Sequence, residues 1–172
     1  MLDYHASLGV RYLVCSGAAN GAVDYPALAD ELAALGEQAA AHGLTFCCHH
    51  GTRELTPPAG GGPLPIDILL ASPFVRLEAD VYWAECTELG AAGLLERCAG
   101  RCPLLHVCDM RDAVSRQRTE PGCGVADILG AVTAALAQGA EWLIVDQNEI
   151  YNDTAASVRT SAQNLRQLTM GL

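Results

Sequence analysis

Residues 75–83 read VRLEADVYW, and residues 104–110, one helical stretch later, read LLHVCDM. Each stretch is a short apolar run that carries a side chain able to bind a metal ion, Asp80 in the first and His106 in the second. Short apolar runs separated by a helical stretch are typical of buried parallel strands. Because the carboxyl ends of parallel strands line the active site of an α/β barrel, Asp80 and His106 are predicted to share one divalent ion.

The rest of the chain alternates strand-like and helix-like stretches around these two runs. Asp24 is predicted to cap a helix that has Pro26 in its first turn, and Gly9, Gly43 and Gly139 are predicted to end helices. Further strands are expected at residues 10–15, 44–49 and 142–146, and helices at residues 24–42, 65–71, 89–98, 125–138 and 154–168. Alternation of this regularity predicts a parallel α/β fold.

Composition and charge exclude several classes of function. The 172 residues suffice for one domain with a core, and they carry a formal charge of −10 with no lysine. The missing lysine excludes Schiff-base chemistry and a phosphate-loop lysine. An acidic chain lacks the basic face that a nucleic acid needs. No apolar run is long enough to span a membrane, and the start lacks the features of a signal peptide, so we expect a cytoplasmic protein.

The cysteines favour reduced thiols over disulfides. The chain has eight of them and no C-x-x-C pair, which argues against zinc ribbons and thioredoxin-type motifs. Cys15, Cys47, Cys48 and Cys108 lie in strand-like runs. We therefore expect the cysteines to be buried and to act as small apolar residues.

Five stretches resemble, in the same order and spacing, motifs of one enzyme family. His49 and Glu54 are similar to a strand-end pattern H-x-H-x-x-E, and residues 49–52 (HHGT) also resemble inosose dehydratases. Residues 78–83 resemble L-D-V-Y-W, and residues 101–110 resemble R-x-P-L-L-H-V-K-D-M. Residues 120–128 resemble G-x-G-x-I-D-W, and residues 142–147 with 156–159 resemble the last strand and helix. The family is that of the sugar phosphate isomerases/epimerases, which are xylose isomerase-like TIM barrels.

The resemblance implies an α/β fold that is part of a (β/α)8 barrel. About five parallel strands with outer helices would correspond to strands four to eight, in a single domain of residues 1–172 whose N-terminal strands are missing. We therefore expect either the C-terminal portion of a longer protein or a dimer that covers the open edges. Three positions depart from the family pattern: Asp146 replaces a glutamate, Cys108 replaces a lysine, and Gly51 replaces the second histidine.

The same resemblance implies the residues of the site. A divalent ion, Mn²⁺, Mg²⁺ or Co²⁺, suits carboxylates with one imidazole. Glu54 and Asp146 would also move protons as acid and base, and His49 competes with Glu54 for the fourth ligand position. Each ligand also has a structural alternative. Asp80 could be a buried carboxylate capped by backbone N–H groups, His106 a core histidine, and Asp146 a helix cap. The expected metal ligands are Glu54, Asp80, His106 and Asp146, and the expected substrate-binding residues are His49, Trp83 and Arg111, with Tyr82 and Arg116 as further candidates.

Such a site predicts a metal-dependent isomerase or epimerase, or a dehydratase, that acts on a sugar, sugar phosphate or cyclitol through an enediolate. The alternative is a truncated, catalytically inactive barrel that acts as a binding or assembly subunit. A hydrolase resembling endonuclease-IV-type enzymes is disfavoured, because the chain is acidic and has five histidines in all. The expected partner is a small sugar-like molecule, without nucleic acid or membrane, and a homo-oligomer is left open.

Overall fold

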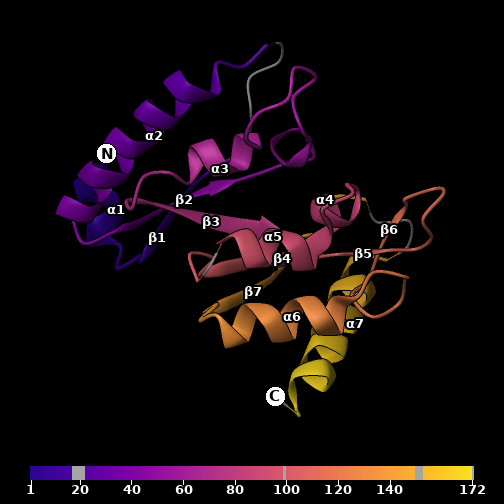
Figure 1. The fold of residues 1–172 in the computed structure, drawn as a ribbon. Coiled ribbons are helices and arrows are strands. Elements are labelled where there is room, and N and C mark those ends of the chain that lie inside the picture. Colours follow the sequence, from indigo (N-terminus) through magenta and orange to yellow (C-terminus); the bar gives the residue numbers. More distant parts are fainter. Residues whose placement is uncertain (17–21, 99, 150–152, 172) are drawn as a thin grey trace. The chain divides into compact units, whose positions relative to one another are not determined.

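The computed structural model describes residues 1–16, 22–98, 100–149 and 153–171. Within them, parallel strands follow the order β1-β2-β3-β4-β7, alternating with helices as in a TIM barrel (Figure 1). This confirms the predicted partial α/β barrel of five parallel strands. The chain divides into two compact units, an N-terminal unit (Met1–Glu78) and a C-terminal unit (Ala79–Leu172). The strands are β1 (Tyr12–Cys15), β2 (Thr45–His49), β3 (Val75–Asp80), β4 (Leu104–Val107) and β7 (Trp142–Val145).

The N-terminal unit packs one long helix against parallel strands. Helix α2 (Tyr25–Ala41) begins where the Asp24 carboxylate accepts a hydrogen bond of 3.1 Å from the Ala27 N–H, which confirms the predicted cap. The helix contacts β2 and α3 (Figure 1), and its buried residues are Leu32, Gly36 and Ala39. The other helices of this unit are α1 (Leu2–Ser7), the 3-10 turn η1 (Arg53–Leu55) and α3 (Pro65–Leu69).

The C-terminal unit is built on the parallel pair β4–β7, whose register runs from Leu104↔Trp142 to Val107↔Val145. Helices α5 (Gly90–Cys98) and α6 (Ile128–Ala137) contact each other and bury apolar side chains such as Leu94 and Val132. A small antiparallel hairpin joins β5 (Asp109–Met110) to β6 (Arg118–Thr119). The remaining helices are α4 (Val81–Glu85) and α7 (Thr154–Thr169).

Two of the predicted strands, β3 and β4, end three residues earlier in the structure than in the sequence analysis. Residues 81–83, predicted as strand, belong to α4, because the Asp80 carboxylate caps the helix by accepting the Trp83 N–H at 2.9 Å. Asp109 and Met110 leave the parallel sheet after Val107 and pair with β6 instead. In both places a carboxylate that binds backbone N–H groups ends the strand, an interaction that apolar periodicity does not report.

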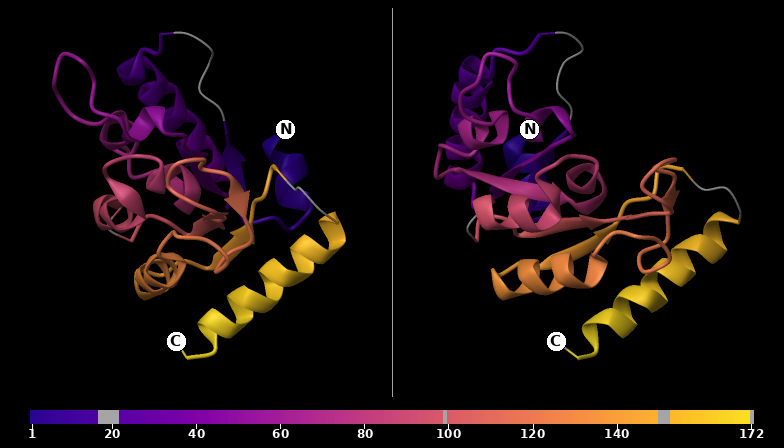
Figure 2. Two further views of the ribbon diagram at one scale, coloured as in Figure 1. Left: turned by 90° about the vertical axis from the view of Figure 1, so that its right-hand side faces the viewer. Right: turned by 45° about the vertical axis from the view of Figure 1, so that its right-hand side comes forward.

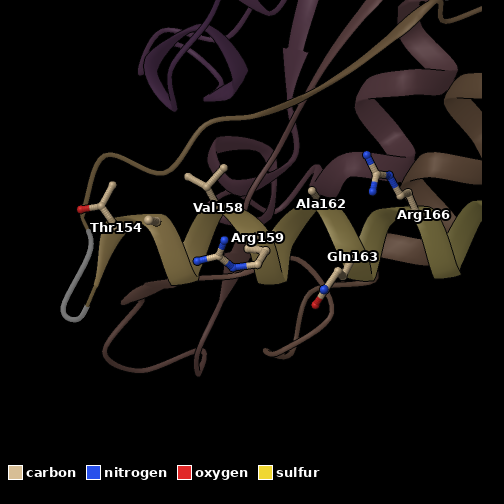
Figure 3. Close-up of a pocket in the computed structure, with 7 residues that line it drawn as sticks. Thr154, Val158, Arg159, Ala162, Gln163 and Arg166 are labelled. Carbon is tan, nitrogen blue, oxygen red and sulfur yellow. The ribbon is translucent and has the colours of Figure 1, made fainter.

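Helix α7 is attached to its unit largely by polar contacts. It contacts α6 and β7 (Figure 2), and its buried residues are Ser157, Ser161 and Leu165. The Asn164 amide donates to the Pro121 carbonyl at 2.8 Å. An open pocket of about 640 Å³ is lined by residues of the helix itself, among them Val158 and Arg159 (Figure 3). Among the described helices none has the length and apolarity to cross a membrane.

The cysteines are thiols, and their burial divides them. Cys47, Cys48 and Cys108 are buried, as the sequence analysis predicted. Cys15 and Cys123 are exposed and Cys86 is half-buried, so the prediction of burial is wrong for these three residues. Cys15 is the last residue of β1, which lies at the edge of the described sheet, and the last two positions of this strand are exposed.

Candidate metal centre

Asp80 stands at the carboxyl end of β3 and is completely buried, with 0% exposure. One carboxylate oxygen, Oδ1, is used to cap α4 through the Trp83 N–H. The other oxygen, Oδ2, lies 3.7 Å from Nδ1 of His106. A buried carboxylate is costly without polar partners, and the cap supplies one of them. Asp80 therefore lies at the strand end where a ligand was predicted, and its carboxylate also caps a helix, as the structural alternative proposed.

His106 lies between two carboxylates. Its Nδ1 is 3.7 Å from Asp80 and also 3.6 Å from Oδ2 of Asp146. The register explains this second approach, because His106 pairs with Ile144 in β7 and Asp146 follows two residues later on the same face. Asp80 and His106 are more shielded than Asp146, whose side chain is 27% exposed. His106 thus lies close to both carboxylates of the C-terminal unit that were predicted as ligands.

The spacing of these groups suits a shared divalent ion. Distances of 3.6–3.7 Å are longer than hydrogen bonds. Ligands bound at ~2.0–2.2 Å from one ion lie roughly 3.0–3.5 Å from one another. Two carboxylates and one imidazole form a hard donor set, which favours Mn²⁺, Mg²⁺ or Co²⁺ over a structural zinc site. The residues present therefore fit the expected ion.

Glu54 and His49, the two candidates for the fourth ligand, lie in the N-terminal unit. Glu54 is 5% exposed, and both its oxygens accept hydrogen bonds there: 2.9 Å from the Tyr25 hydroxyl and 2.8 Å from the Gly51 N–H. His49 ends β2, in register with Glu78 of β3, and its ring stacks on that of His50. The carboxylate of Glu54 is thus held by its own unit.

The hydrogen bond between Tyr25 and Glu54 predicts a loss of stability at alkaline pH. Burial, followed by the hydrogen bond to Glu54, raises the pKa of the Tyr25 phenol from 10.0 to about 12. This stabilisation is fully present below pH 10 and is lost as the pH rises toward 12, because the unfolded chain ionises first. Urea unfolding at several alkaline pH values should show this slope in the wild type and a weaker one in Tyr25→Phe. Equal slopes would contradict the assignment.

Arg118 is a site residue that the sequence analysis missed. It is 4% exposed, and its guanidinium lies over the rings of Tyr82, at 3.9 Å, and Trp83, at 4.9 Å. Within the described part of the chain, no group accepts a hydrogen bond from its buried Nη1. Its only signal in the sequence is an arginine in a predicted loop. The pairing of Met110 with Arg118 in the β5–β6 hairpin brings it here.

The other predicted substrate-binding residues lie around this arginine or on the surface. Trp83 is half-buried and packs edge-on against Tyr82 at 5.1 Å. The Tyr82 hydroxyl donates to the Arg116 carbonyl at 2.8 Å. Arg111 is exposed, and its backbone N–H donates to Gln117 within the hairpin. The structure thus brings Trp83 beside a buried cation and leaves Arg111 on the hairpin surface.

Cys108, at the position of the family's lysine, is a neutral group beside the centre. The pKa of its thiol is raised to about 11, chiefly by burial; Arg118 acts to lower it, and the Asp80 and Asp146 carboxylates act to raise it. The thiol lies against the carbonyls of Asp109 and Thr119. Arg118 therefore places a positive charge close to this thiol.

Asp109 organises the loop that follows β6. It is completely buried, and its two oxygens accept four backbone N–H groups at 2.7–3.0 Å, from Met110, Gly122, Gly124 and Ala126. A side chain at Gly124 would collide with the Met110 carbonyl and with Asp109 itself, so only glycine fits there. Asp109 and the backbone of residues 122–126 thus form one hydrogen-bonded unit, which we call the clasp.

Comparisons with known proteins bear on the fold. No family model and no curated protein matches the sequence. Solved structures do match, among them a sugar phosphate isomerase/epimerase from Parabacteroides distasonis, with 21% identity over 98% of this chain and a TM-score of 0.81. The chain has the fold of the xylose isomerase-like TIM barrels.

Two further structures with the xylose isomerase-like fold are epimerases. D-allulose 3-epimerase from Methylomonas sp. matches with 16% identity over 97% of this chain and a TM-score of 0.70. The 3-keto-D-glucoside 4-epimerase from E. coli matches with 17% identity over 97% and a TM-score of 0.68. This chain spans 61% of the length of the Parabacteroides protein and 66% of that of each epimerase.

Proposed function

We propose that the chain is a metal-dependent isomerase or epimerase, or a dehydratase, for a sugar, sugar phosphate or cyclitol. The observation that carries this proposal is that the Asp80 and Asp146 carboxylates lie 3.7 Å and 3.6 Å from Nδ1 of His106. Solved structures of the same fold that are sugar epimerases support the substrate class. Mn²⁺, Mg²⁺ or Co²⁺ is the proposed cofactor.

The residues around the centre have distinct roles in this proposal. A divalent ion held by Asp80, His106 and Asp146 would bind a carbonyl and a hydroxyl oxygen and acidify the C–H bond beside them. Asp146, the most exposed of the three, would accept or return the proton at its carboxylate. Arg118 would donate from Nη1 to an oxygen that gains negative charge, and Trp83 would pack on the apolar face of the sugar.

Two measurements test this proposal. Isothermal titration calorimetry of the chain with Mn²⁺ should show one site of micromolar affinity or better. Proton NMR of the Mn²⁺-loaded chain in D₂O, with a panel of ketoses and inososes, should show exchange of one carbon-bound proton next to the carbonyl. Absence of heat with Mn²⁺, Mg²⁺ and Co²⁺ would overturn the metal centre. Metal binding without exchange would favour the binding or assembly subunit instead.

For the fourth ligand we choose His49 over Glu54, because both oxygens of Glu54 already accept hydrogen bonds. His49→Ala should weaken Mn²⁺ binding about tenfold or more, whereas Glu54→Gln should change it less than about threefold. Calorimetry on both variants decides between them. The reverse order would restore Glu54 as ligand, together with its predicted acid–base role.

The short carboxylate at residue 146 gives a second expectation. Asp146→Glu should keep the metal and raise any turnover, because it extends the carboxylate by roughly one C–C bond, and a displacement of ~1 Å changes rates up to ~100-fold. Calorimetry and the proton-exchange rate measure the two effects. Asp127→Glu, on the exposed cap of α6, is the matched control. A variant that lost Mn²⁺ would show that the centre is built for the shorter side chain.

A further inference from the structure

Cys15 and Cys48 lie opposite each other on neighbouring strands. Cys15 ends β1, and the parallel register pairs it directly with Cys48 of β2. Adjacent strands are ~4.8 Å apart. Disulfides join residues whose Cα atoms are ~4.4–6.8 Å apart. The backbone therefore already holds these two cysteines at a distance that a disulfide can bridge.

The two side chains also share one face of the sheet. Both line a cavity of about 40 Å³ together with Leu28 and Leu32 of α2. Cys47, one residue earlier on β2, points to the opposite face because side chains alternate along a strand. Cys15 is exposed, whereas Cys48 is 3% exposed. An oxidant in solution can therefore reach the Cys15 thiol, whereas the Cys48 thiol is buried beside it.

We propose that Cys15 and Cys48 form a reversible disulfide on exposure to a hydroperoxide. The Cys15 sulfur attacks one peroxide oxygen, the O–O bond breaks, and a sulfenic acid forms with release of water or an alcohol. The Cys48 sulfur then attacks the Cys15 sulfur, the S–O bond breaks, and the hydroxyl of the sulfenic acid leaves as water with the proton of the Cys48 thiol. An external dithiol reverses the reaction by exchange.

The disulfide would join β1 to β2 at their carboxyl ends, next to His49. Oxidation would therefore fix the strand end from which the proposed fourth metal ligand projects. A bond at an exposed strand end is of the kind that reductants reach easily. The disulfide itself does not depend on the proposed function, since it follows from the register of the N-terminal unit alone.

The experiment is peptide mapping of the wild-type chain after treatment with one equivalent of hydrogen peroxide and alkylation of the remaining thiols. The expected result is a cross-linked peptide pair containing Cys15 and Cys48, with the loss of two hydrogens, which dithiothreitol releases. In Cys48→Ser, Cys15 should instead stop at a sulfenic acid that dimedone traps. Cys123→Ser, which removes the exposed cysteine of the C-terminal unit, should leave the cross-link unchanged.

Two outcomes would overturn the proposal. One is oxidation of Cys15 to a sulfinic acid while Cys48 remains alkylated as a thiol. The other is a cross-link from Cys15 mainly to Cys47 or to another chain. Neither outcome involves the metal, so calorimetry with Mn²⁺ on the reduced protein tests the proposed function separately.

Discussion

Replacing Asp80 with asparagine is expected to weaken Mn²⁺ binding at least about 100-fold, since loss of a first ligand exceeds the ~10–100-fold effect of its supporting groups. The amide oxygen of asparagine can still accept the Trp83 N–H that Asp80 caps, so α4 should remain folded. What the variant loses is the negative charge that faces His106 at 3.7 Å. Asp80→Ala should abolish binding and also remove the cap. Titration calorimetry with Mn²⁺ measures both.

Asp127→Asn is the matched control for this experiment. Asp127 caps α6 through the Gly130 N–H at 2.9 Å, as Asp80 caps α4, but it is not among the converging groups. This variant should bind Mn²⁺ like the wild type. If Asp80→Asn keeps its affinity within about twofold while circular dichroism shows a folded chain, the carboxylate serves only as a helix cap.

Replacing Asp109 with alanine is expected to destabilise the C-terminal unit by at least about 3 kcal/mol, because it leaves several buried backbone N–H groups without acceptors. These groups belong to Met110, Gly122, Gly124 and Ala126. Urea unfolding measures the loss, and hydrogen exchange at those amides should accelerate in the same variant. Because the clasp positions the β5–β6 hairpin, the packing of Arg118 over Tyr82 should also loosen.

Asp112→Ala is the control for the clasp. Asp112 also accepts backbone hydrogen bonds in the hairpin, from Val114 and Ser115. The Ser115 hydroxyl, followed by these backbone bonds, lowers the pKa of its carboxyl. Asp112 is only half-buried, so water can replace it, and the free energy of unfolding should hardly change. Equal effects of the two variants would mean that the loop does not depend on the buried carboxylate.

Local sequence determined the alternation of strands and helices and much of the centre. Asp24 with Pro26 marks the start of α2, and the apolar runs before Asp80 and His106 mark two strands. These signals are local, since each depends on a capping side chain, a proline ring or a pattern of apolar residues within a few positions of the chain. The approach of Asp80 and Asp146 to His106 was predictable because parallel strands align their carboxyl ends at one edge.

Only the tertiary structure decided which side chains the other polar residues contact. Arg118 reaches Tyr82 across 36 positions of the chain because the hairpin turns back, whereas Arg111, chosen from the sequence, stays exposed. Glu54 accepts a hydrogen bond from the Tyr25 hydroxyl, and Asp109 accepts hydrogen bonds from a loop more than ten residues later in the chain. Such partners depend on the path of the backbone, which the periodicity of the sequence does not encode. The same short carboxylate can accept hydrogen bonds from a helix N-terminus or a loop, or it can bind an ion, and its local sequence does not tell which.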